Sequence, residues 1–342
     1  MGLLPCCLWY NWAMKTVKGL TRRDFLSAGA AATAAGALGG CRVFAGGAAD
    51  FDENLSVFLA DPHVCANPEM RRWLYTQGEF DRRIAEILAM DPLPRNVVVF
   101  GDLCFNNGDI RDYRLARRQI DLLTAAGIRV TLGTGNHDRR NTFLEVFPEA
   151  AKGSPVPGRI VSCVSLGHCD LVLLDSLKAA DGVERGPTEG ELDDAQQEWL
   201  AADLPTRTRP TVVAAHHPAR ELRVKGRKMG AVLQDAPKAV GWINGHEHFW
   251  MKEPLGAYFW EASNQDTLRG LYLPSAGLWG DIGYVEFRTG PTAAVAKLVQ
   301  VDYWFHDHLH PGEEKPETWR AIIEENDGDV CRFPYARAYR KG

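Results

Sequence analysis

The pattern of hydrophobic and polar positions changes character about halfway along this chain. The first half contains short apolar runs with the length and β-branched content of buried strands, at 55–60, 96–100 and 128–132. Between these runs, the segments 79–90 and 112–126 carry apolar side chains at helical spacing. Gly127 follows the second segment directly, as is typical of a helix C-cap. This alternation, with short connections, predicts βαβ units.

The second half is richer in strand-like runs. Two of them, 159–164 and 171–174, are joined by Gly167-His168 and are expected to be neighbours, and 193–204 has the pattern of a helix. Strands are also predicted at 211–214 and 239–243. Later apolar runs follow with no convincing helix between them, at 256–262, 271–275, 283–288 and 292–300. These runs predict a second, mixed or antiparallel sheet packed on the first.

Side chains that can bind a metal follow nearly every predicted strand of the core. They fall in five segments: Asp61-Pro62-His63, Gly101-Asp102, Gly135-Asn136-His137-Asp138, His216-His217-Pro218 and Gly245-His246-Glu247-His248. Because ligands in α/β folds bind outside the carboxyl ends of the strands, we expect these segments to meet in space. Carboxylate, imidazole and carbonyl oxygen are the donors that hard and borderline divalent metals prefer. The sequence therefore predicts a metal site at the strand ends.

Local spacing supports this interpretation. Asp61 and His63 lie two positions apart in an extended segment, so both side chains can point to one side, and His246 and His248 repeat that spacing. Asp102 follows a buried strand, where a carboxylate needs a partner such as a metal. Each segment taken alone is more often an ordinary turn. The ordered set of five is the feature that indicates metal chemistry.

The five segments, in this order, resemble the DxH, GD, GNH, H and GHxH pattern of the calcineurin-like metallophosphoesterases. The resemblance covers residues 55 to about 300 and includes Leu174-Asp175-Ser176 with Trp199-Leu200 downstream. It implies an α/β fold, a four-layer αββα sandwich with two packed mixed β-sheets and a dinuclear metal site at the strand ends. It also implies hydrolysis of a phosphomonoester or phosphodiester by in-line attack of a hydroxide that bridges two metals about 3.5–4 Å apart.

The resemblance assigns a role to each polar residue of the motifs. One divalent metal would be held by Asp61, His63 and His248, the other by Asn136, His216 and His246, with Asp102 bridging the two. His137 would contact the phosphoryl oxygen or protonate the leaving group, and Asp138 would orient it by accepting its other ring proton. The metals are Mn, Fe or Zn, and the sequence does not choose among them.

Two positions depart from patterns found among relatives. Phe105 stands three residues after the bridging aspartate, where purple acid phosphatases carry an iron-binding tyrosine, so a ferric tyrosinate centre is not expected. Thr134 stands where many relatives have proline, and we expect it to touch no ligand.

The substrate is less well defined than the chemistry. A basic segment follows the fourth motif and is either a solvated loop or an electrostatic collar for a phosphate-bearing substrate: Arg220, Arg223, Lys225, Arg227 and Lys228. Arg139 and Arg140 could serve the same purpose, and the His-Asp-Arg order resembles bacterial cyclic-nucleotide phosphodiesterases. Asn106 and Asn107 are candidate pocket residues. The tract 306–310, with His306, His308 and His310, is either a surface loop or an accessory metal site.

Composition narrows the partners. The formal net charge of −5 gives no basic footprint, so a small phosphoester rather than a nucleic-acid polymer is expected, and the oligomeric state stays open. The eight cysteines contain no CxxC pair, and most are expected to be buried thiols. A non-catalytic binding scaffold with the same fold is the alternative function. Such members usually lack one or more ligands, whereas none is missing here.

Residues 1–45 are predicted to be an export signal, followed by the metallophosphoesterase domain at 46–302 and a C-terminal extension at 303–342. Arg22-Arg23 before an Ala/Gly-rich run resembles a bacterial twin-arginine signal, and the run is too short and Gly-rich for a stable membrane span. A disordered or helical Ala-rich arm is the alternative. Cys41 ends a lipobox-like sequence, so the mature protein is either a lipoprotein anchored to a membrane through acylated Cys41 or a soluble periplasmic protein cleaved after Ala45.

Overall fold

The computed structural model describes residues 50–67, 75–178, 188–255, 268–304 and 317–339. The predicted export signal, with Arg22, Arg23 and Cys41, lies outside these residues, as do the apolar run at 256–262 and the histidine tract at 306–310. Within the described residues, no helix combines the length and the apolar character needed to cross a membrane.

The first sheet has six strands in the order β14-β13-β12-β1-β2-β3. Their bounds are β1 Phe51–Leu59, β2 Leu93–Val99, β3 Arg129–Leu132, β12 Gly280–Thr289, β13 Ala293–Trp304 and β14 Val330–Pro334. β1, β2 and β3 run parallel and are connected through α3 (Thr76–Leu88) and α4 (Ile110–Ala125), which confirms the predicted βαβ units. The α4 helix begins at a capping residue, Asp109, whose carboxylate accepts from the Arg111 backbone N–H at 2.9 Å.

The second sheet also has six strands, in the order β10-β11-β9-β6-β5-β4. Their bounds are β4 Ser162–Ser165, β5 Asp170–Leu173, β6 Thr211–Ala214, β9 Ala239–Asn244, β10 Met251–Pro254 and β11 Arg269–Tyr272. The four central strands are parallel, and β4 and β10 pair antiparallel at the two edges, so this sheet is mixed. Its helices are α6 (Asp194–Asp203) and α7 (Met229–Asp235), with a small hairpin of β7 (Arg223–Val224) and β8 (Arg227–Lys228) before α7.

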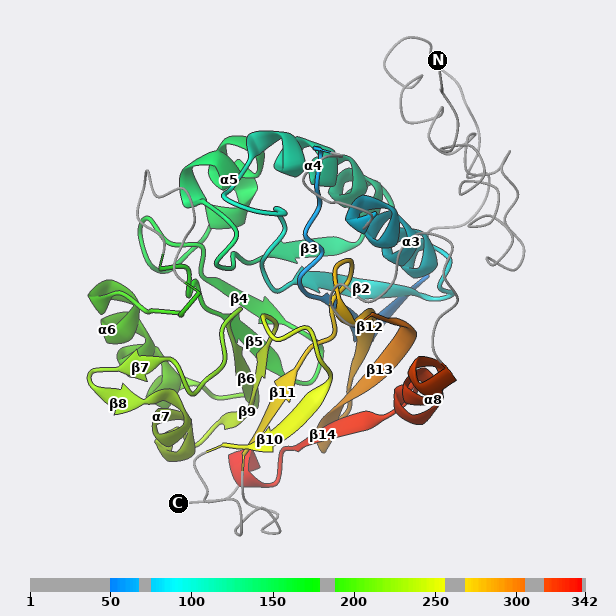
Figure 1. The fold of residues 1–342 in the computed structure, drawn as a ribbon. Coiled ribbons are helices and arrows are strands. Elements are labelled where there is room, and N and C mark those ends of the chain that lie inside the picture. The colour runs from blue at the N-terminus through cyan, green and yellow to red at the C-terminus, as the bar shows by residue number, and fades with distance from the viewer. Residues whose placement is uncertain (1–49, 68–74, 179–187, 256–267, 305–316, 340–342) are drawn as a thin grey trace, which may run out of the picture. The chain divides into compact units, whose positions relative to one another are not determined.

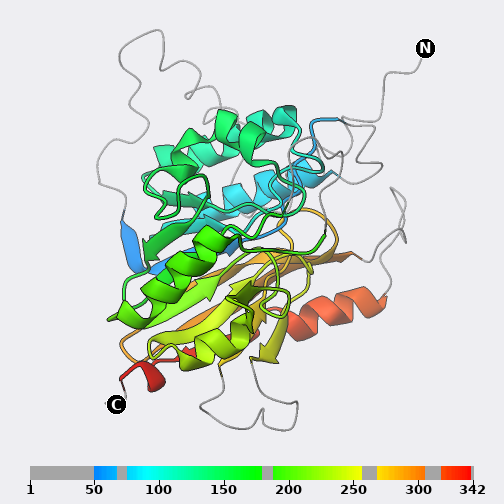
Figure 2. The ribbon, with the colours of Figure 1, turned by 90° about the vertical axis from the view of Figure 1, so that its left-hand side faces the viewer.

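Side chains from both sheets meet in one apolar layer. Along β1, Phe58 points into this layer, while Val57 and Leu59 point to the opposite face, as the two-residue period of a strand requires. The opposite face of the first sheet is covered by α3, α4 and α5 (Arg140–Val146), and that of the second sheet by α6 and α7 (Figure 1; Figure 2). This arrangement confirms the predicted four-layer αββα sandwich.

The sequence-based assignment of late strands to the second sheet is wrong for two of them. The runs at 283–288 and 292–300 became β12 and β13, and β12 pairs antiparallel with β1 in the first sheet. The free edge of β1 accepts the returning chain, and an apolar run carries no information about which of two apolar sheets it will join.

The segment beyond 302 contributes to the same sheet. β13 continues to Trp304, across the predicted boundary at 302/303, and β14 pairs antiparallel with it. The helix α8 (Glu317–Asn326) lies between these strands in the chain. The described part also contains short 3-10 helices at Pro148–Ala151, Leu204–Thr206 and Arg337–Tyr339.

Candidate metal centre

All seven predicted ligands lie in the turns that follow strands, and these turns meet where the two sheets present their carboxyl ends. Asp61 and His63 follow β1, Asp102 follows β2, Asn136 follows β3, His216 follows β6, and His246 and His248 follow β9. Six of the seven are at most 5% exposed, and His246 is partly exposed. Both sheets therefore supply donors, which explains why residues separated by up to 187 positions come together.

The turns have an unusual backbone. Seven described residues other than glycine have a positive φ, and five of them are predicted ligands: Asp61 (52°), His63 (44°), Asp102 (51°), His246 (74°) and His248 (63°). Side chains with a Cβ rarely adopt this conformation, and strain of this kind clusters at functional sites. Backbone hydrogen bonds between the first two turns hold it in place, from the Asp61 and His63 N–H groups to the carbonyls of Gly101 and Asp102 at 3.2 and 3.0 Å.

Two glycines make the close approach of the turns feasible. A Cβ on Gly101 would lie 2.6 Å from the Gly135 nitrogen and 2.9 Å from Nδ1 of His216. A Cβ on Gly135 would lie 2.3 Å from Oδ1 of Asp102. Both contacts are too short for real atoms, so glycine before Asp102 and before Asn136 is a steric requirement of the site.

The donors form two groups that match the two predicted ligand sets. In the first, Nε2 of His248 lies 3.3 Å from Oδ1 of Asp61 and 3.3 Å from Nε2 of His63. In the second, Oδ1 of Asn136 lies 3.1 Å from Nε2 of His216 and 2.9 Å from Nδ1 of His246.

Asp102 lies between the groups. Its Oδ2 is 3.6 Å from Nε2 of His63 and 3.3 Å from Nε2 of His216.

In three of the imidazoles, the hydrogen bond of Nδ1 determines which nitrogen faces the cluster. Nδ1 of His63 faces the carbonyl of Phe105 at 3.3 Å, Nδ1 of His216 that of Phe100 at 3.0 Å, and Nδ1 of His248 that of Trp279 at 3.2 Å. A carbonyl only accepts, so each Nδ1 carries the proton, and each Nε2 presents its lone pair to the cluster. Nitrogen lone pairs and carboxylate oxygens that face one another with few protons to share repel each other unless a cation lies between them.

The donor spacing fits such a cation. Donor atoms that share a metal at about 2.0–2.2 Å are about 3–3.5 Å apart, and the donors here are 2.9–3.3 Å apart except Nε2 of His63 and Oδ1 of Asp61, which are 4.0 Å apart. The mixture of imidazole, carboxylate and amide oxygen suits borderline and hard divalent ions. The residues present therefore fit a dinuclear centre.

The electrostatics of the cluster are dominated by burial and by its two carboxylates. Burial disfavours the charged form of His216, but the carboxylates of Asp102 and Asp61 outweigh it and raise its pKa to about 9, so without a cation this ring also holds a proton on Nε2, which a bound metal would replace. Burial, together with the neighbouring His137, lowers the pKa of His63 to about 3. Burial would raise the pKa of the Asp102 carboxyl, but His216 and His137 hold it well below its usual range. The bridging position is thus anionic at neutral pH, as a metal ligand must be.

His137 lies beside the predicted ligands. Its ring stands nearly perpendicular to that of His63, with centroids 4.7 Å apart, and its Nδ1 donates to the Phe105 carbonyl at 2.8 Å. The Phe105 carbonyl therefore orients both His63 and His137. Phe105 itself has no donor atom in its side chain, in keeping with the sequence argument against a tyrosinate centre.

The predicted pairing of Asp138 with the His137 ring is wrong. The buried Asp138 carboxylate instead accepts from the backbone N–H groups of Leu103, Cys104 and Gly135 and from the hydroxyl of Tyr113, at 2.9–3.3 Å. Successive side chains in a tight turn point in different directions, so Asp138 ties its turn to the Asp102 turn instead. Burial and the nearby Asp102 raise its pKa to about 7.

Sequence reasoning assigned no contact to a further buried carboxylate, that of Asp175. Asp175 is fully buried and accepts from Nε and Nη2 of Arg140 at 2.6 and 2.8 Å and from the hydroxyl of Thr134 at 2.9 Å. Thr134, which stands where many relatives have proline, therefore provides a hydrogen bond between the second sheet and the turn that carries His137. The Leu174-Asp175-Ser176 sequence is part of the family resemblance, but sequence spacing does not indicate the hydrogen-bond partners of Asp175.

Two arginines of the basic segment after His216 have partners outside the predicted ligand set. Arg220 contacts Glu247, which lies between two predicted ligands, and the hydroxyl of Tyr272. Arg227 pairs with Asp235 of α7, and Arg223, Lys225 and Lys228 belong to the β7–β8 hairpin. Arg139 is buried and donates to the carbonyl of Asn136 at 3.2 Å, so it stabilises the turn that carries Asn136.

Trp279, Asn106 and Asn107 also lie near the predicted ligands or His137. The Trp279 ring lies on His248 with centroids 4.5 Å apart, a contact that no sequence signal indicated. The side-chain oxygens of Asn106 and Asn107 are buried without a hydrogen-bond partner, and their loop is tied to His137 by a bond from the Gly108 N–H to the His137 carbonyl at 2.9 Å.

Two packed sheets with a cluster of metal-binding donors at their strand ends define the class of dinuclear metal hydrolases. The sequence model described as calcineurin-like phosphoesterase matches residues 56–249, more than half of the 342 residues. The chain belongs to the calcineurin-like phosphoesterase family. This confirms the resemblance in the sequence, supports metal-dependent phosphoester hydrolysis as the general activity, and implies a dinuclear divalent metal site.

Solved structures agree on the fold. A dimetal phosphatase from Danio rerio aligns with a TM-score of 0.55 at 16% identity, covering 71% of this chain and 95% of that one. A purple acid phosphatase from yellow lupin (Lupinus luteus) seeds gives 0.51 at 14% identity, covering 72% of this chain and 51% of the lupin chain. No curated protein matches the sequence.

Proposed function

We propose that this protein hydrolyses a phosphomonoester or phosphodiester at a centre of two divalent metals. One metal would be held by Asp61, His63 and His248, the other by Asn136, His216 and His246, and Asp102 would contribute to both sites. The observation that carries the proposal is that carbonyl partners on Nδ1 turn Nε2 of three imidazoles toward the carboxylates of Asp61 and Asp102. A pair of bound divalent ions supplies an activated water and neutralises charge on the phosphoryl oxygens.

The residues of the chain fix the geometry of that reaction. The Asp102 carboxylate is held by the His137 backbone N–H, which donates to its Oδ1 at 2.8 Å and leaves Oδ2 for the centre. His137 has Nδ1 occupied by the Phe105 carbonyl, so Nε2 is its remaining nitrogen for the substrate. We infer that this Nε2 donates a proton to the leaving oxygen or a hydrogen bond to the phosphoryl group.

Metal loading and turnover test the proposal together. The protein is stripped with a chelator and reloaded with Mn, Fe or Zn, and bound metal is measured by elemental analysis. Turnover is then measured with 4-nitrophenyl phosphate, bis(4-nitrophenyl) phosphate and cyclic nucleotides. We expect two ions per chain and turnover of at least one ester, and both should fall in Asn136→Ala. Two bound ions without turnover of any ester would favour the binding scaffold.

His137→Ala separates the two roles of that side chain. It should retain both metals and lose more rate on an alkyl ester than on a nitrophenyl ester, whose leaving group needs little protonation. Equal losses on both esters would favour charge stabilisation of the phosphoryl group. Loss of metal would move His137 into the ligand set.

We also infer that the chain is exported by the twin-arginine route, on the strength of the Arg22-Arg23 sequence. Replacing both arginines by lysine should retain the protein in the cytoplasm. Cys41→Ser should release a membrane-anchored form, whereas extraction of the wild type by salt alone would contradict acylation.

A further inference from the structure

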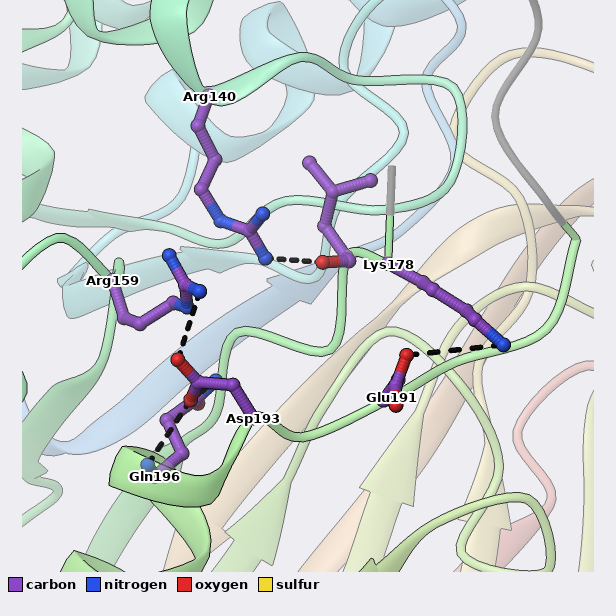
Figure 3. A pocket seen from close by; sticks show the side chains of 7 residues that line it. Arg140, Arg159, Lys178, Glu191, Asp193 and Gln196 are labelled. Carbon is purple, nitrogen blue, oxygen red and sulfur yellow. Dashed lines mark hydrogen bonds and ion pairs between the residues drawn. The ribbon is translucent and has the colours of Figure 1, made fainter. Parts of the chain in front are cut away.

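A cavity of about 230 Å³ lies next to Arg140, three residues after His137 in the chain (Figure 3). Its polar lining comes from Arg140, Arg159, Lys178, Glu191, Asp193 and Gln196. At about 30 Å³ per water molecule, the volume corresponds to seven or eight waters. This is below the roughly 300–1,000 Å³ of sites that enclose a whole drug-sized ligand, so the cavity suits one part of a substrate.

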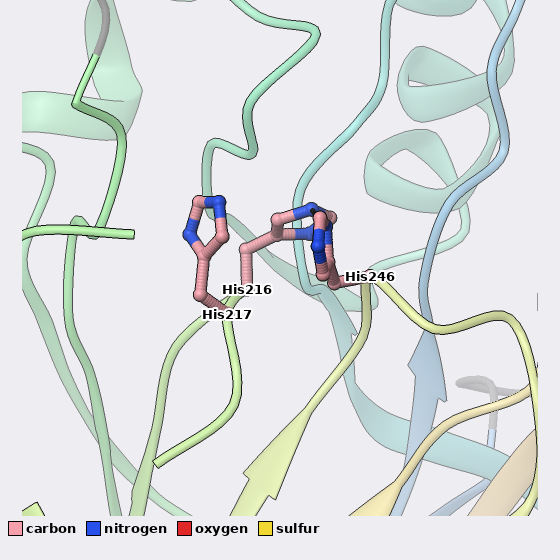
Figure 4. Close-up of side chains that lie close together, drawn as sticks. All are labelled: His216, His217 and His246. Carbon is pink, nitrogen blue, oxygen red and sulfur yellow. Dashed lines mark hydrogen bonds between the residues drawn. The ribbon is translucent and has the colours of Figure 1, made fainter. Parts of the chain in front are cut away.

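His217 and Ser176 link the metal centre to residues of the cavity lining. His217 lies against the rings of His216 and His246, with centroids 4.9 Å from each, as Figure 4 shows. On its other side, Nδ1 of His217 and the Ser176 hydroxyl are 2.7 Å apart, and a Cβ on Gly190 would lie 2.5 Å from His217 Cβ. The residues that follow Ser176 and Gly190 in the chain are Leu177 and Glu191, which line the cavity.

Arg140 connects the cavity to the turn that carries His137. Its guanidinium is held by the buried Asp175 and by the Leu177 carbonyl, through Nε and Nη2. These bonds fix the plane of the guanidinium at the cavity and leave Nη1 as a donor for a ligand. A group bound there would be placed relative to His137 by a rigid connection of three residues.

The charges around the cavity cancel. Nη2 of Arg159 lies 2.8 Å from Oδ2 of Asp193, and Lys178 lies 3.8 Å from Glu191. Arg140 is paired with Asp175. Since each cation already has a carboxylate partner, an incoming anion meets little net positive field.

The lining also excludes apolar groups. Leu177 is the one apolar side chain among the lining residues, and none of them is aromatic. A nucleobase would find no ring to stack on, and an acyl chain would find no apolar surface. The cavity presents hydrogen-bond donors and acceptors side by side. Hydroxyl groups match such a lining, because each can both donate and accept a hydrogen bond.

We propose that this cavity is the subsite for the organic part of the substrate, and that it binds a neutral, hydroxyl-rich group such as a sugar or another polyol. The proposal rests on the phosphoesterase function and adds the chemical class of the ester group. Hydroxyls would take hydrogen bonds from Arg140 and Arg159 and give them to Asp193 and Glu191.

A matched pair of diesters tests the proposal. 4-Nitrophenyl 2,3-dihydroxypropyl phosphate and 4-nitrophenyl propyl phosphate have the same charge and the same leaving group, and they differ only in two hydroxyls. We expect kcat/KM of the metal-loaded enzyme to be about tenfold higher or more for the dihydroxy ester. In the double variant Arg159→Gln, Lys178→Gln the ratio should fall toward one. In Arg227→Gln, whose partner Asp235 belongs to α7 outside the cavity lining, the wild-type ratio should persist.

Equal kcat/KM for the two esters, or a ratio that survives in the double variant, would overturn the subsite while leaving phosphoester hydrolysis established. A direct binding measurement covers the case in which neither diester is hydrolysed. Saturation-transfer NMR with sorbitol at millimolar concentration should give a signal with the wild-type protein that is lost in the double variant. Absence of that signal in the wild type, or its displacement by inorganic phosphate, would refute a polyol site.

Discussion

The strands of this protein and the turns that follow them are equally buried but chemically opposite. In β1, Val57, Phe58 and Leu59 are fully buried apolar residues of an ordinary strand. Asp61 and His63, a few residues later, are at most 1% exposed, are polar, and have a positive φ. Apolar burial in the strand stabilises the fold, whereas a buried polar group without a partner and a left-handed backbone both cost free energy.

The difference shows that the turns, and not the strands, contain features that lower the stability of the fold. Each costly feature of the turns places a donor atom, and none of them improves packing. Strain of this kind persists only where the surrounding structure enforces it, and here the well-packed strands on either side do so. The comparison predicts that changes in the turns alter activity far more than stability, and that changes in the strands do the reverse.

The largest expected effect is that of Asp102→Asn. Asparagine tolerates a positive φ, so the turn should keep its shape, but the charge at the bridging position is lost. We expect kcat to fall at least about a thousandfold, because several kcal/mol of charge stabilisation depend on the bound metals. Bound metal should fall as well. Urea unfolding of the chelated protein should change by less than the roughly 3–5 kcal/mol expected for a core truncation, because the lost attraction to His216 is partly offset by the lost repulsion from Asp61, and a larger loss would contradict the comparison.

Phe58→Ala should do the opposite. The Phe58 ring stacks on Phe287 with centroids 4.6 Å apart and lies 5.0 Å from the Phe100 ring, between the two sheets. Truncation leaves a cavity there, and we expect the free energy of unfolding to drop by about 3–5 kcal/mol. Turnover per folded, metal-loaded molecule should stay within a few-fold of the wild type. Phe58→Leu is the matched control and should cost less because it retains most of the volume.

Asp175→Asn tests a residue that we expect to affect both stability and activity. The substitution removes one charge from a buried pair with Arg140 and weakens the bond from Thr134, so we expect a loss of about 3 kcal/mol in unfolding free energy. The turn bearing His137 should also move, which lowers kcat about tenfold with bound metal unchanged. Thr134→Val is the control for the hydroxyl alone and should cost about 1 kcal/mol. An unchanged kcat in Asp175→Asn would limit Asp175 to a structural role.

The sequence predicted what each strand end carries, because strand bodies are marked by apolar runs and their ends by glycine and polar residues. β6 was predicted at its observed bounds, and six predicted ligands lie in two groups with Asp102 between them. The sheet of β12 and β13 was not predictable, since that choice depends on which edge is free. Contacts of Asp138 and Asp175 were also missed, because they depend on side-chain directions between residues 25 and 41 positions apart.

The smallest expected effect concerns strain that serves no function. Lys225 and Gly226, with φ of 48° and 78°, join β7 to β8 as the two central residues of a hairpin turn. Such a turn favours asparagine followed by glycine, so Lys225→Asn should stabilise the protein by about 0.5–1 kcal/mol. The gain is measurable as a rise of about 1–3 °C in Tm. Activity should not change, because the hairpin carries none of the proposed ligands.

A matched variant isolates the backbone contribution. A Cβ on Gly226 would meet no atom within 4 Å, so Gly226→Ala introduces strain without a steric clash. We expect it to lower the unfolding free energy by about 1 kcal/mol, opposite in sign to Lys225→Asn. At the metal centre the same relief is not available, since replacing His63 or His248 by glycine would remove a donor. If Lys225→Asn fails to stabilise while Gly226→Ala destabilises, the positive φ of a charged side chain costs less here than assumed. The strain at the five predicted ligands with a positive φ would then also be smaller.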